Sequence, residues 1–283
     1  MDRAAILVLG LLAGSFLNVC IHRLPRGISV VRPRSHCPHC GHAIAAWENI
    51  PILGYLFLGG RCRGCRAPIS ARYPLVEAAT AGVFYFAYAF YGAAPEFLRA
   101  SFFFTAMLAL VCTDYDTRQL PDEITLGGLV VGCVFAFLVP GTPVPALDAV
   151  VGAVVGGGIL WAVGEGYFRL RGRAGMGFGD VKMMACVGAF LGWRLTLTTL
   201  VLAAFAGSLA GVSWAALVFA RRAWRGRRRG RSWKAAAAAA RASVGVFFAR
   251  HALPFGVFLG AMAAASWLWG QGLWTWYMQL AQH

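Results

Sequence analysis

The chain has 283 residues, of which 59% are hydrophobic and 13% are charged, and its formal net charge is +15. Soluble domains carry about 25% charged residues, so this composition excludes an ordinary soluble protein and indicates a polytopic membrane protein. The positive charge requires no nucleic-acid partner, and none is expected, because basic loops are attracted to the anionic cytosolic leaflet of a bilayer.

Apolar runs follow one another along the chain and predict an all-α fold of about eight transmembrane helices. Most are long enough to cross ~30 Å of hydrocarbon at about 1.5 Å per residue. The sixth run is short, so a buried or thinned span is expected there. The runs cover residues 4–21, 74–91, 97–112, 124–139, 146–168, 181–193, 195–220 and 253–277.

The first apolar run, within residues 1–22, is expected to be a retained transmembrane helix. Little positive charge precedes it and a strong basic cluster follows it, which is the opposite of a secretory signal peptide. When the chain is traced through eight crossings, all Lys and Arg residues except Arg3, Arg99 and Arg194 fall on one face of the membrane. The positive-inside rule predicts that this face is cytosolic and that both termini lie outside.

Residues 23–73 have a composition of their own, and a small cytosolic, zinc-ribbon-like subdomain is expected there. Two CxxC pairs, about twenty residues apart, match the pattern of a four-thiolate zinc site. A metal would supply much of the folding free energy of so small a unit. The predicted ligands are Cys37, Cys40, Cys62 and Cys65.

Two other chemistries would use the same cysteines. Disulfides are disfavoured by the predicted cytosolic location, and a redox site would need only one pair. His36, His39 and His42 crowd the first pair and could replace a thiol as ligands, but solvated neighbours are the simpler interpretation.

Acidic residues cluster where the third apolar run ends. Asp122 and Glu123 begin the next predicted helix and suit its positive end, while Asp116 is near water and could simply solvate the turn. Asp114 lies two residues deeper and is the acid least explained by capping. An ionisable group at a membrane boundary indicates a functional site by default.

A second lone carboxylate, Asp180, follows Gly175, Gly177 and Gly179, which we expect to give the backbone freedom to place it at the mouth of a span. Two aspartates that meet across neighbouring helices can share one proton and activate a water molecule, as in aspartic proteases. Lys182 follows two residues later, and its charge would either bias this pair or meet a phosphate head group.

The bundle is expected to occupy residues 74–283, with a strongly basic segment at 221–250. This segment carries six consecutive alanines after Arg-rich sequence, and an interfacial helix lying on the membrane is predicted for it.

The chain resembles the type IV prepilin peptidases, bifunctional membrane enzymes that cut leader peptides and N-methylate the new terminus. The resemblance covers nearly the whole chain and rests on the order and spacing of several motifs. These are Gly14-Ser15-Phe16-Leu17-Asn18-Val19 with Arg23-Leu24-Pro25, the two cysteine pairs flanking Asn49-Ile50-Pro51, Ile69-Ser70-Ala71-Arg72-Tyr73-Pro74-Leu75-Val76-Glu77, Asp114-Tyr115-Asp116 with Leu120-Pro121-Asp122, and Gly175-Met176-Gly177-Phe178-Gly179-Asp180-Val181-Lys182.

The resemblance implies that Asp114 and Asp180 are the catalytic pair of an aspartic endopeptidase. Asp114 is selected over Asp116 because the family's active aspartate sits eight positions before the last residue of the Leu-Pro-Asp motif, here Asp122. The substrates would be type IV prepilins and pseudopilins of pilus and type II secretion systems, cut after a short basic leader at the cytosolic face of the bacterial inner membrane.

The same resemblance implies N-methylation with S-adenosylmethionine as the methyl donor. It makes Gly60 and Arg61, directly before Cys62, candidates for that activity. The glycine-rich nucleotide loop of soluble methyltransferases is not visible, so the resemblance leaves the binding mode of the donor open.

Three alternatives remain at this level. The presenilin and signal-peptide-peptidase group also uses a GxGD string but lacks a cysteine-bearing loop after the first span. A proton-coupled transporter would use membrane acids as a relay and cleave no peptide. A zinc-bearing adaptor for pilus or secretion assembly would depend on Cys37 and its partners while both aspartates proved dispensable.

Overall fold

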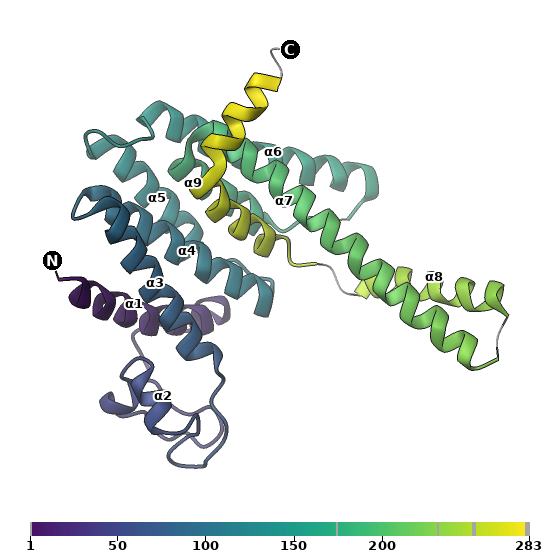
Figure 1. Ribbon diagram of the computed structural model, residues 1–283, viewed down its shortest axis with the longest axis horizontal. Coiled ribbons are helices and arrows are strands. Elements are labelled where there is room, and N and C mark those ends of the chain that lie inside the picture. The colour runs from purple at the N-terminus through teal and green to yellow at the C-terminus, as the bar shows by residue number, and fades with distance from the viewer. Residues whose placement is uncertain (1, 174, 231, 251–252, 281–283) are drawn as a thin grey trace.

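The computed structural model describes residues 2–173, 175–230, 232–250 and 253–280, and long helices dominate these residues (Figure 1). Most of them pack side by side in one bundle, with a small subdomain below α1 and α3, whereas α8 and the end of α7 project away from the bundle (Figure 1). The long helices are α1 (Arg3–Arg23), α3 (Arg72–Tyr91), α4 (Pro95–Thr117), α5 (Asp122–Leu138), α6 (Ala146–Arg171), α7 (Phe178–Arg228), α8 (Trp233–Arg250) and α9 (Phe255–Leu280). The predicted all-α architecture is confirmed for the described residues.

Four segments of these helices are long and apolar enough to cross a membrane. They are Arg3–Arg26, Pro95–Thr117, Ala146–Arg171 and Phe178–Arg228. The predicted count of about eight spans is not established by this criterion and stays a prediction.

Helix α7 contains the sixth and seventh predicted spans, and Gly192 separates them. Gly192 has φ +71° and ψ 171°, which is outside the helical region and open only to glycine. On α6, Gly152 lies against Gly188 and Gly192, whereas Gly156, one turn later, lies against Met184 and Thr196. The two parts of α7 therefore run along α6 in opposite directions, as a helical hairpin.

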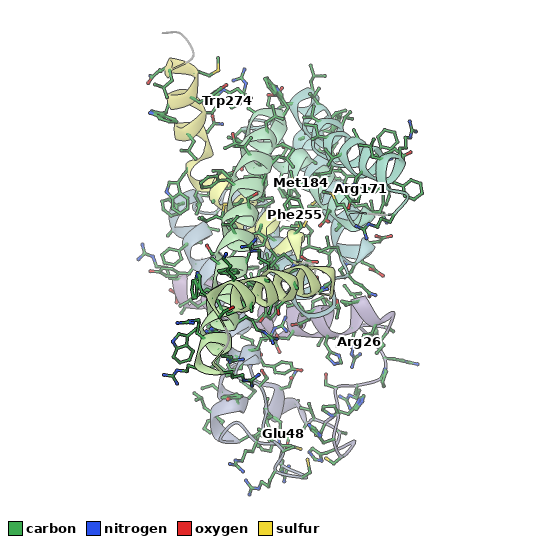
Figure 2. All side chains as sticks on the ribbon, turned by 90° about the vertical axis from the view of Figure 1, so that its right-hand side faces the viewer. Arg26, Glu48, Arg171, Met184, Phe255 and Trp274 are labelled. Atoms are coloured by element: carbon green, nitrogen blue, oxygen red, sulfur yellow. The ribbon has the colours of Figure 1, made fainter. Side chains whose placement is uncertain are left out.

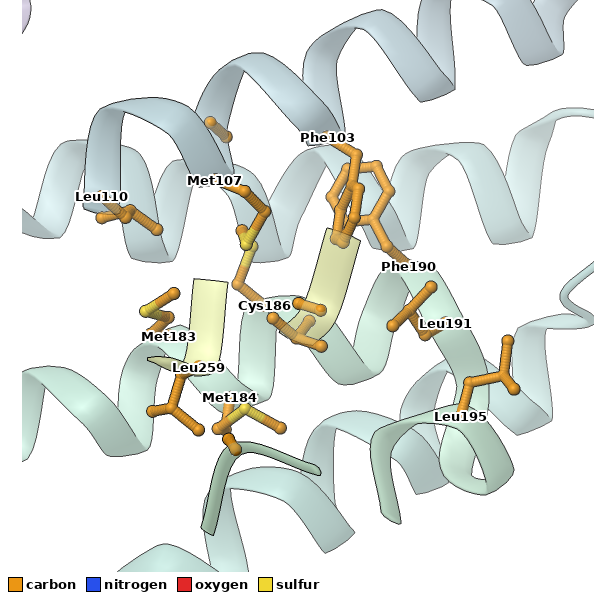
Figure 3. Packing of buried hydrophobic residues seen from close by; sticks show 14 of the residues in the cluster. Phe103, Met107, Leu110, Met183, Met184, Cys186, Phe190, Leu191, Leu195 and Leu259 are labelled. Atoms are coloured by element: carbon orange, nitrogen blue, oxygen red, sulfur yellow. The ribbon is translucent and has the colours of Figure 1, made fainter. Parts of the chain in front are cut away.

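The core of the bundle lies between α4, α7 and α9 (Figure 3). Its centre is formed by fully or almost fully buried side chains, among them Phe103, Met107, Leu110, Met183, Phe190 and Leu259. The residues before Gly192 are almost all buried, which agrees with the buried short segment expected at 181–193. The first part of α7 is thus the central helix that the others surround.

A buried cation stabilises the bend in α7. The Arg99 guanidinium, 4% exposed, donates to the backbone oxygen of Phe190 and to Glu96 Oε2, the latter at 2.8 Å. It also lies 4.5 Å from the ring centroid of Trp267. Because a helix that stops at Gly192 leaves carbonyl groups without helical partners, Arg99 supplies a donor where water is excluded.

The subdomain between α1 and α3 is irregular, with η1 (Leu24–Arg26), η2 (Ala46–Asn49) and α2 (Leu53–Phe57). A hydrogen bond holds it to α3, because the Ile52 N–H donates to Glu77 Oε2 at 2.7 Å. Next to it, Asn18 Nδ2 of α1 donates to the Tyr73 carbonyl at the start of α3, at 3.0 Å. Glu77 thereby anchors the subdomain to α3.

The predicted helix across 221–250 is wrong in its boundaries. Residues up to Arg228 continue α7, and α8 folds back along them as an antiparallel partner (Figure 1). A Cβ on Gly226 would lie 2.9 Å from Ala236 Cβ, and Ala236 and Ala240 are buried in this contact. The alanine run thus packs against α7 at close range, and Arg231 lies outside the described residues.

Candidate active site and metal centre

Asp114 lies near the end of α4, 5% exposed, and faces the beginning of α9. Its Oδ2 accepts the Val257 N–H at 3.0 Å. A Cβ on Gly256 would lie 2.8 Å from the same oxygen, so a side chain there would displace the carboxylate. The free N–H groups and positive dipole end of α9 suit a carboxylate here.

Asp180 lies in the first turn of α7, 9% exposed. Gly177 has φ −74° and Gly179 lies inside the first turn of α7, so neither needs backbone angles reserved for glycine, and the expectation of backbone freedom is wrong for both. A Cβ on Gly179 would lie 3.0 Å from Leu120 Cβ, so this glycine lets α7 begin tightly against the turn before α5. A Cβ on Gly175 would lie 2.4 Å from the ring of Tyr167, so this glycine lets the chain pass close to α6.

The fold brings the two aspartates into one region. Asp114 and Asp180 are close enough to interact electrostatically, although they are 66 positions apart in the chain. Neither has a salt-bridge partner among the described residues. The Arg118 charge also acts on Asp114. Two buried carboxylates in one region are costly to ionise together. Their catalytic roles stay a prediction.

Asp116, the rival of Asp114, is already paired. It accepts a hydrogen bond from Nη1 of Arg72, the first residue of α3. Nη2 of the same guanidinium donates to the Cys112 carbonyl at 3.2 Å. Arg72 thus fastens the beginning of α3 to the end of α4, which gives Asp116 a structural role beyond solvating a turn.

Lys182 is paired as well. Its Nζ lies 2.7 Å from both carboxylate oxygens of Asp122, the first residue of α5. This ion pair gives Lys182 a structural role, and the two roles expected for it, biasing the aspartate pair or binding a head group, stay predictions. It joins the Leu-Pro-Asp turn to the first turn of α7 and so stabilises the backbone position of Asp180.

The four predicted zinc ligands converge in the subdomain. The sulfur atoms of Cys37, Cys40, Cys62 and Cys65 all lie within 4.8 Å of one another, and all are free thiols. The Cys37–Cys65 and Cys40–Cys62 sulfurs are both 3.9 Å apart. Tetrahedral bonds of about 2.3 Å would place sulfurs about 3.8 Å apart, so the residues fit a zinc ion.

The thiols show why a cation suits this cluster. Backbone N–H groups of Cys40 and His39 lower the pKa of Cys37 to about 7. The His42 N–H also lowers the pKa of Cys40, but burial and the neighbouring thiols outweigh it and raise that pKa to about 11. Four thiolates at this spacing would repel one another, and a bound divalent cation would offset that repulsion.

Glu48 lies in the subdomain (Figure 2) and connects the two cysteine turns, a role that sequence reasoning missed. Its Oε2 accepts the Ala45 N–H at 2.7 Å and lies 3.3 Å from His42 Nε2, while Oε1 lies 3.7 Å from Arg63 Nη1. The Ala45 N–H is the main cause of a lowered Glu48 pKa, followed by the interactions with His42 and Arg63. His42 therefore has a partner, unlike the solvated neighbour expected.

A cavity of about 490 Å³ opens between the subdomain and the ends of α1 and α3. Glu48, Tyr55 and Glu77 are among its lining residues, whereas Gly60 and Arg61 are not. Gly60, with φ +66°, lies behind the wall, where its Cβ would come 2.9 Å from Tyr55 Oη. The structure thus places the methyl-transfer candidates next to a cavity and outside its lining.

Fold and site together define a helical membrane protein with two buried carboxylates at one end of its bundle and a four-thiolate subdomain beside them. Residues 8–91 match the Bacterial Peptidase A24 N-terminal domain, and residues 101–212 match the Type IV leader peptidase family. The chain belongs to the type IV leader peptidase family. This membership and the four apolar helices indicate a protein of the inner membrane.

Relatives named prepilin leader peptidase/N-methyltransferase resemble the chain over most of its length. The protein from Burkholderia pseudomallei (strain 1026b) is 38% identical, covering 95% of this chain and 86% of its own. That from Aeromonas hydrophila is 35% identical, covering 96% and 92%, and that from Pseudomonas putida is 42% identical, covering 72% and 78%. No solved structure matches the chain.

Proposed function

We propose that this protein cleaves the leader peptide of type IV prepilins and pseudopilins and methylates the amino terminus that cleavage releases. The observation that supports the peptidase activity is the pair Asp114 and Asp180, two buried carboxylates that interact and have no salt-bridge partner among the described residues. The names of the relatives supply the substrate class and the second activity.

In the proposed cleavage, one ionised aspartate takes a proton from a water molecule held between Asp114 and Asp180. The other aspartate, protonated, donates a hydrogen bond to the scissile carbonyl. The carbonyl carbon gains the hydroxide, and the C–N bond then breaks as the nitrogen receives a proton. The products are a leader carboxylate and a new amino terminus, and no covalent enzyme intermediate is needed.

The position of the pair suits such a substrate. Asp114 and Asp180 lie at the ends of membrane-crossing candidates, next to polar turns. A scissile segment between a basic leader and an apolar helix must be unwound, and it finds water and backbone partners at the membrane edge. We place this edge, the subdomain and the basic α7–α8 hairpin on the cytosolic side by their positive charge.

Methyl transfer requires a donor, and S-adenosylmethionine supplies an electrophilic methyl group when bound. The neutral terminal amine of the pilin forms the N–C bond as the S–C bond breaks, and the amine proton leaves to solvent. S-adenosylhomocysteine is the other product. Because an α-amino group has a pKa of about 7.7–8.0, a useful fraction is neutral near pH 7. Zinc held by the four cysteines would have a structural role.

The peptidase assignment is tested with Asp114→Asn, Asp180→Asn and the matched control Asp116→Asn. Because general acid–base catalysis contributes about 10²–10⁴-fold, each of the first two substitutions should lower cleavage of a co-reconstituted prepilin by at least 10²-fold. The control should retain cleavage within about tenfold of wild type. The measurement is mass spectrometry of the pilin, in which leader loss and a one-methyl gain are separate signals.

Normal cleavage by both Asp114→Asn and Asp180→Asn would overturn the assignment. If Asp116→Asn alone lost cleavage, the catalytic role assigned to Asp114 would belong to Asp116. Substrate-dependent proton flux without cleavage would instead support the transporter alternative.

A further inference from the structure

We infer that the cavity between the subdomain and the ends of α1 and α3 binds S-adenosylmethionine, and that Gly60 serves this site by holding Tyr55 in its wall. The inference rests on the proposed methyl transfer and gives that activity a location. At about 490 Å³ the cavity falls in the range of about 300–1,000 Å³ that is usual for small-molecule sites.

The first observation is a buried carboxylate oxygen with no hydrogen bond. The Glu48 side chain is 2% exposed, and its Oε1 has no hydrogen-bond partner among the described residues. The nearest cation, Arg63 Nη1, is 3.7 Å away on a side chain that is 59% exposed. A buried acceptor in this state favours a donor or a cation. S-adenosylmethionine carries two positive groups, a sulfonium and an ammonium, and one carboxylate.

The second observation is backbone strain in the cavity wall. Ile52 has φ +59° and ψ −50°, a conformation that a β-branched residue rarely adopts. Its N–H is held at 2.7 Å by Glu77 Oε2, and both residues line the cavity. Strained backbone persists where surrounding contacts fix it, and it concentrates at ligand sites. Glu77 thereby fixes the backbone of Ile52 in the cavity wall and adds a second carboxylate to the lining.

The third observation concerns the aromatic wall. Tyr55 lines the cavity, and the backbone of Gly60 approaches its ring so closely that a Cβ would lie 2.9–3.0 Å from Oη and Cζ. Gly60 also has φ +66°, which disfavours any side chain. An aromatic face next to carboxylates suits both a sulfonium cation and an adenine ring.

The cavity is connected to the proposed cleavage site by the start of α3. Tyr73 and Glu77 line the cavity, and the preceding Arg72 binds Asp116 and the Cys112 carbonyl of α4. Asp114 belongs to the same turn of α4. A pilin terminus released at the aspartates would therefore find the donor on the neighbouring helix.

The test is equilibrium dialysis of radiolabelled S-adenosylmethionine with the full-length protein in nanodiscs. Tyr55→Ala removes the ring, Val19→Phe fills the cavity from α1, and Gly60→Ala displaces Tyr55 from behind. Each should weaken binding at least tenfold while the protein keeps its zinc content, and Tyr55→Ala and Val19→Phe should keep the wild-type melting temperature. Gly60→Ala should lower the melting temperature, because alanine is strained at φ +66°. Tyr55→Phe should restore binding close to that of wild type.

The matched control is Leu56→Ala, which changes the neighbouring residue of α2, 64% exposed and outside the cavity lining. It should bind the donor as wild type does. If the wild type methylates a prepilin while Tyr55→Ala and Val19→Phe bind the donor as tightly as wild type, the cavity assignment is wrong and the proposed function stands. If the wild type neither methylates a prepilin nor binds the donor, the cavity assignment and the proposed methyl transfer both fail. Leader-peptide binding that these variants weaken, with donor binding unchanged, would also overturn the assignment.

Discussion

At the residue scale, ion pairs distinguish three nearby acids from the two candidate aspartates. Asp116 has Arg72, Asp122 has Lys182 and Glu96 has Arg99. The Asp114 carboxylate instead accepts a backbone N–H at the start of α9. A carboxylate held in this way keeps an oxygen available for water, whereas an ion-paired one is committed to its partner.

Gly256→Ala should reduce leader cleavage because the new methyl group would lie 2.8 Å from Asp114 Oδ2. The carboxylate is the flexible member of this contact, so it would move by a few tenths of an ångström or more. Displacements approaching 1 Å cost about 10²-fold in rate, and we expect a loss of about 10- to 100-fold. The measurement is initial cleavage rate at saturating prepilin.

The control for this change is Gly272→Ala, in the same helix with no neighbour within 4 Å of the new methyl group. It should cleave at the wild-type rate. Equal rates in the two variants would show that the approach of α9 does not position Asp114.

At the element scale, one bend decides the arrangement of the bundle. Gly192 reverses α7, and Arg99 of α4 gives the buried Phe190 carbonyl a donor. The hairpin lies against a glycine face of α6, where a Cβ on Gly188 would meet Gly152 O at 2.1 Å. Small residues allow this approach, as is usual for helices that pack in membranes. The central segment that carries Asp180 is therefore fixed from both ends.

Gly192→Ala should destabilise the protein by about 1–3 kcal/mol, because alanine would be forced into backbone angles that only glycine adopts readily. The measurement is the free energy of unfolding in mixed micelles. Gly158→Ala in α6 is the control: its methyl group would meet nothing within 4 Å, and alanine favours a helix by about 0.5–1 kcal/mol. Equal stability of the two variants would contradict the assigned role of the bend.

At the scale of the whole molecule, the candidate sites and most of the positive charge lie at the same end. The subdomain, both aspartates and the beginning of α9 lie there, and the second part of α7 passes Leu253 at Gly211 before it continues into the basic hairpin with α8. No acid interrupts residues 213–250. By the positive-inside rule, we propose that this end faces the cytosol.

This orientation predicts which introduced cysteines a bulky, membrane-impermeant maleimide can reach. Thr142→Cys, between α5 and α6, should gain a label in intact spheroplasts. Ser232→Cys, between α7 and α8, should gain one only after lysis. The measurement is the gel shift relative to wild type, whose own cysteines provide the baseline. Labelling of Ser232→Cys before lysis would reverse the orientation.

Much of the architecture is determined by local sequence. Apolar length predicts membrane helices, and CxxC spacing predicts the thiolate cluster that the structure brings together. The motif order predicts the family that the comparisons then show. These signals depend on composition and on short-range spacing, which a single chain carries without reference to its fold.

Other properties depend on contacts between segments far apart in the chain, and only the tertiary structure decides them. The pairing of Lys182 with Asp122 and of Arg72 with Asp116, the role of Glu77 as an anchor and the packing role of Gly175 and Gly179 all arise where helix ends meet. The sequence shows which residues can ionise and where glycines allow the backbone to bend. It does not show which of them face one another, because that is fixed by the approach of helices across the bundle.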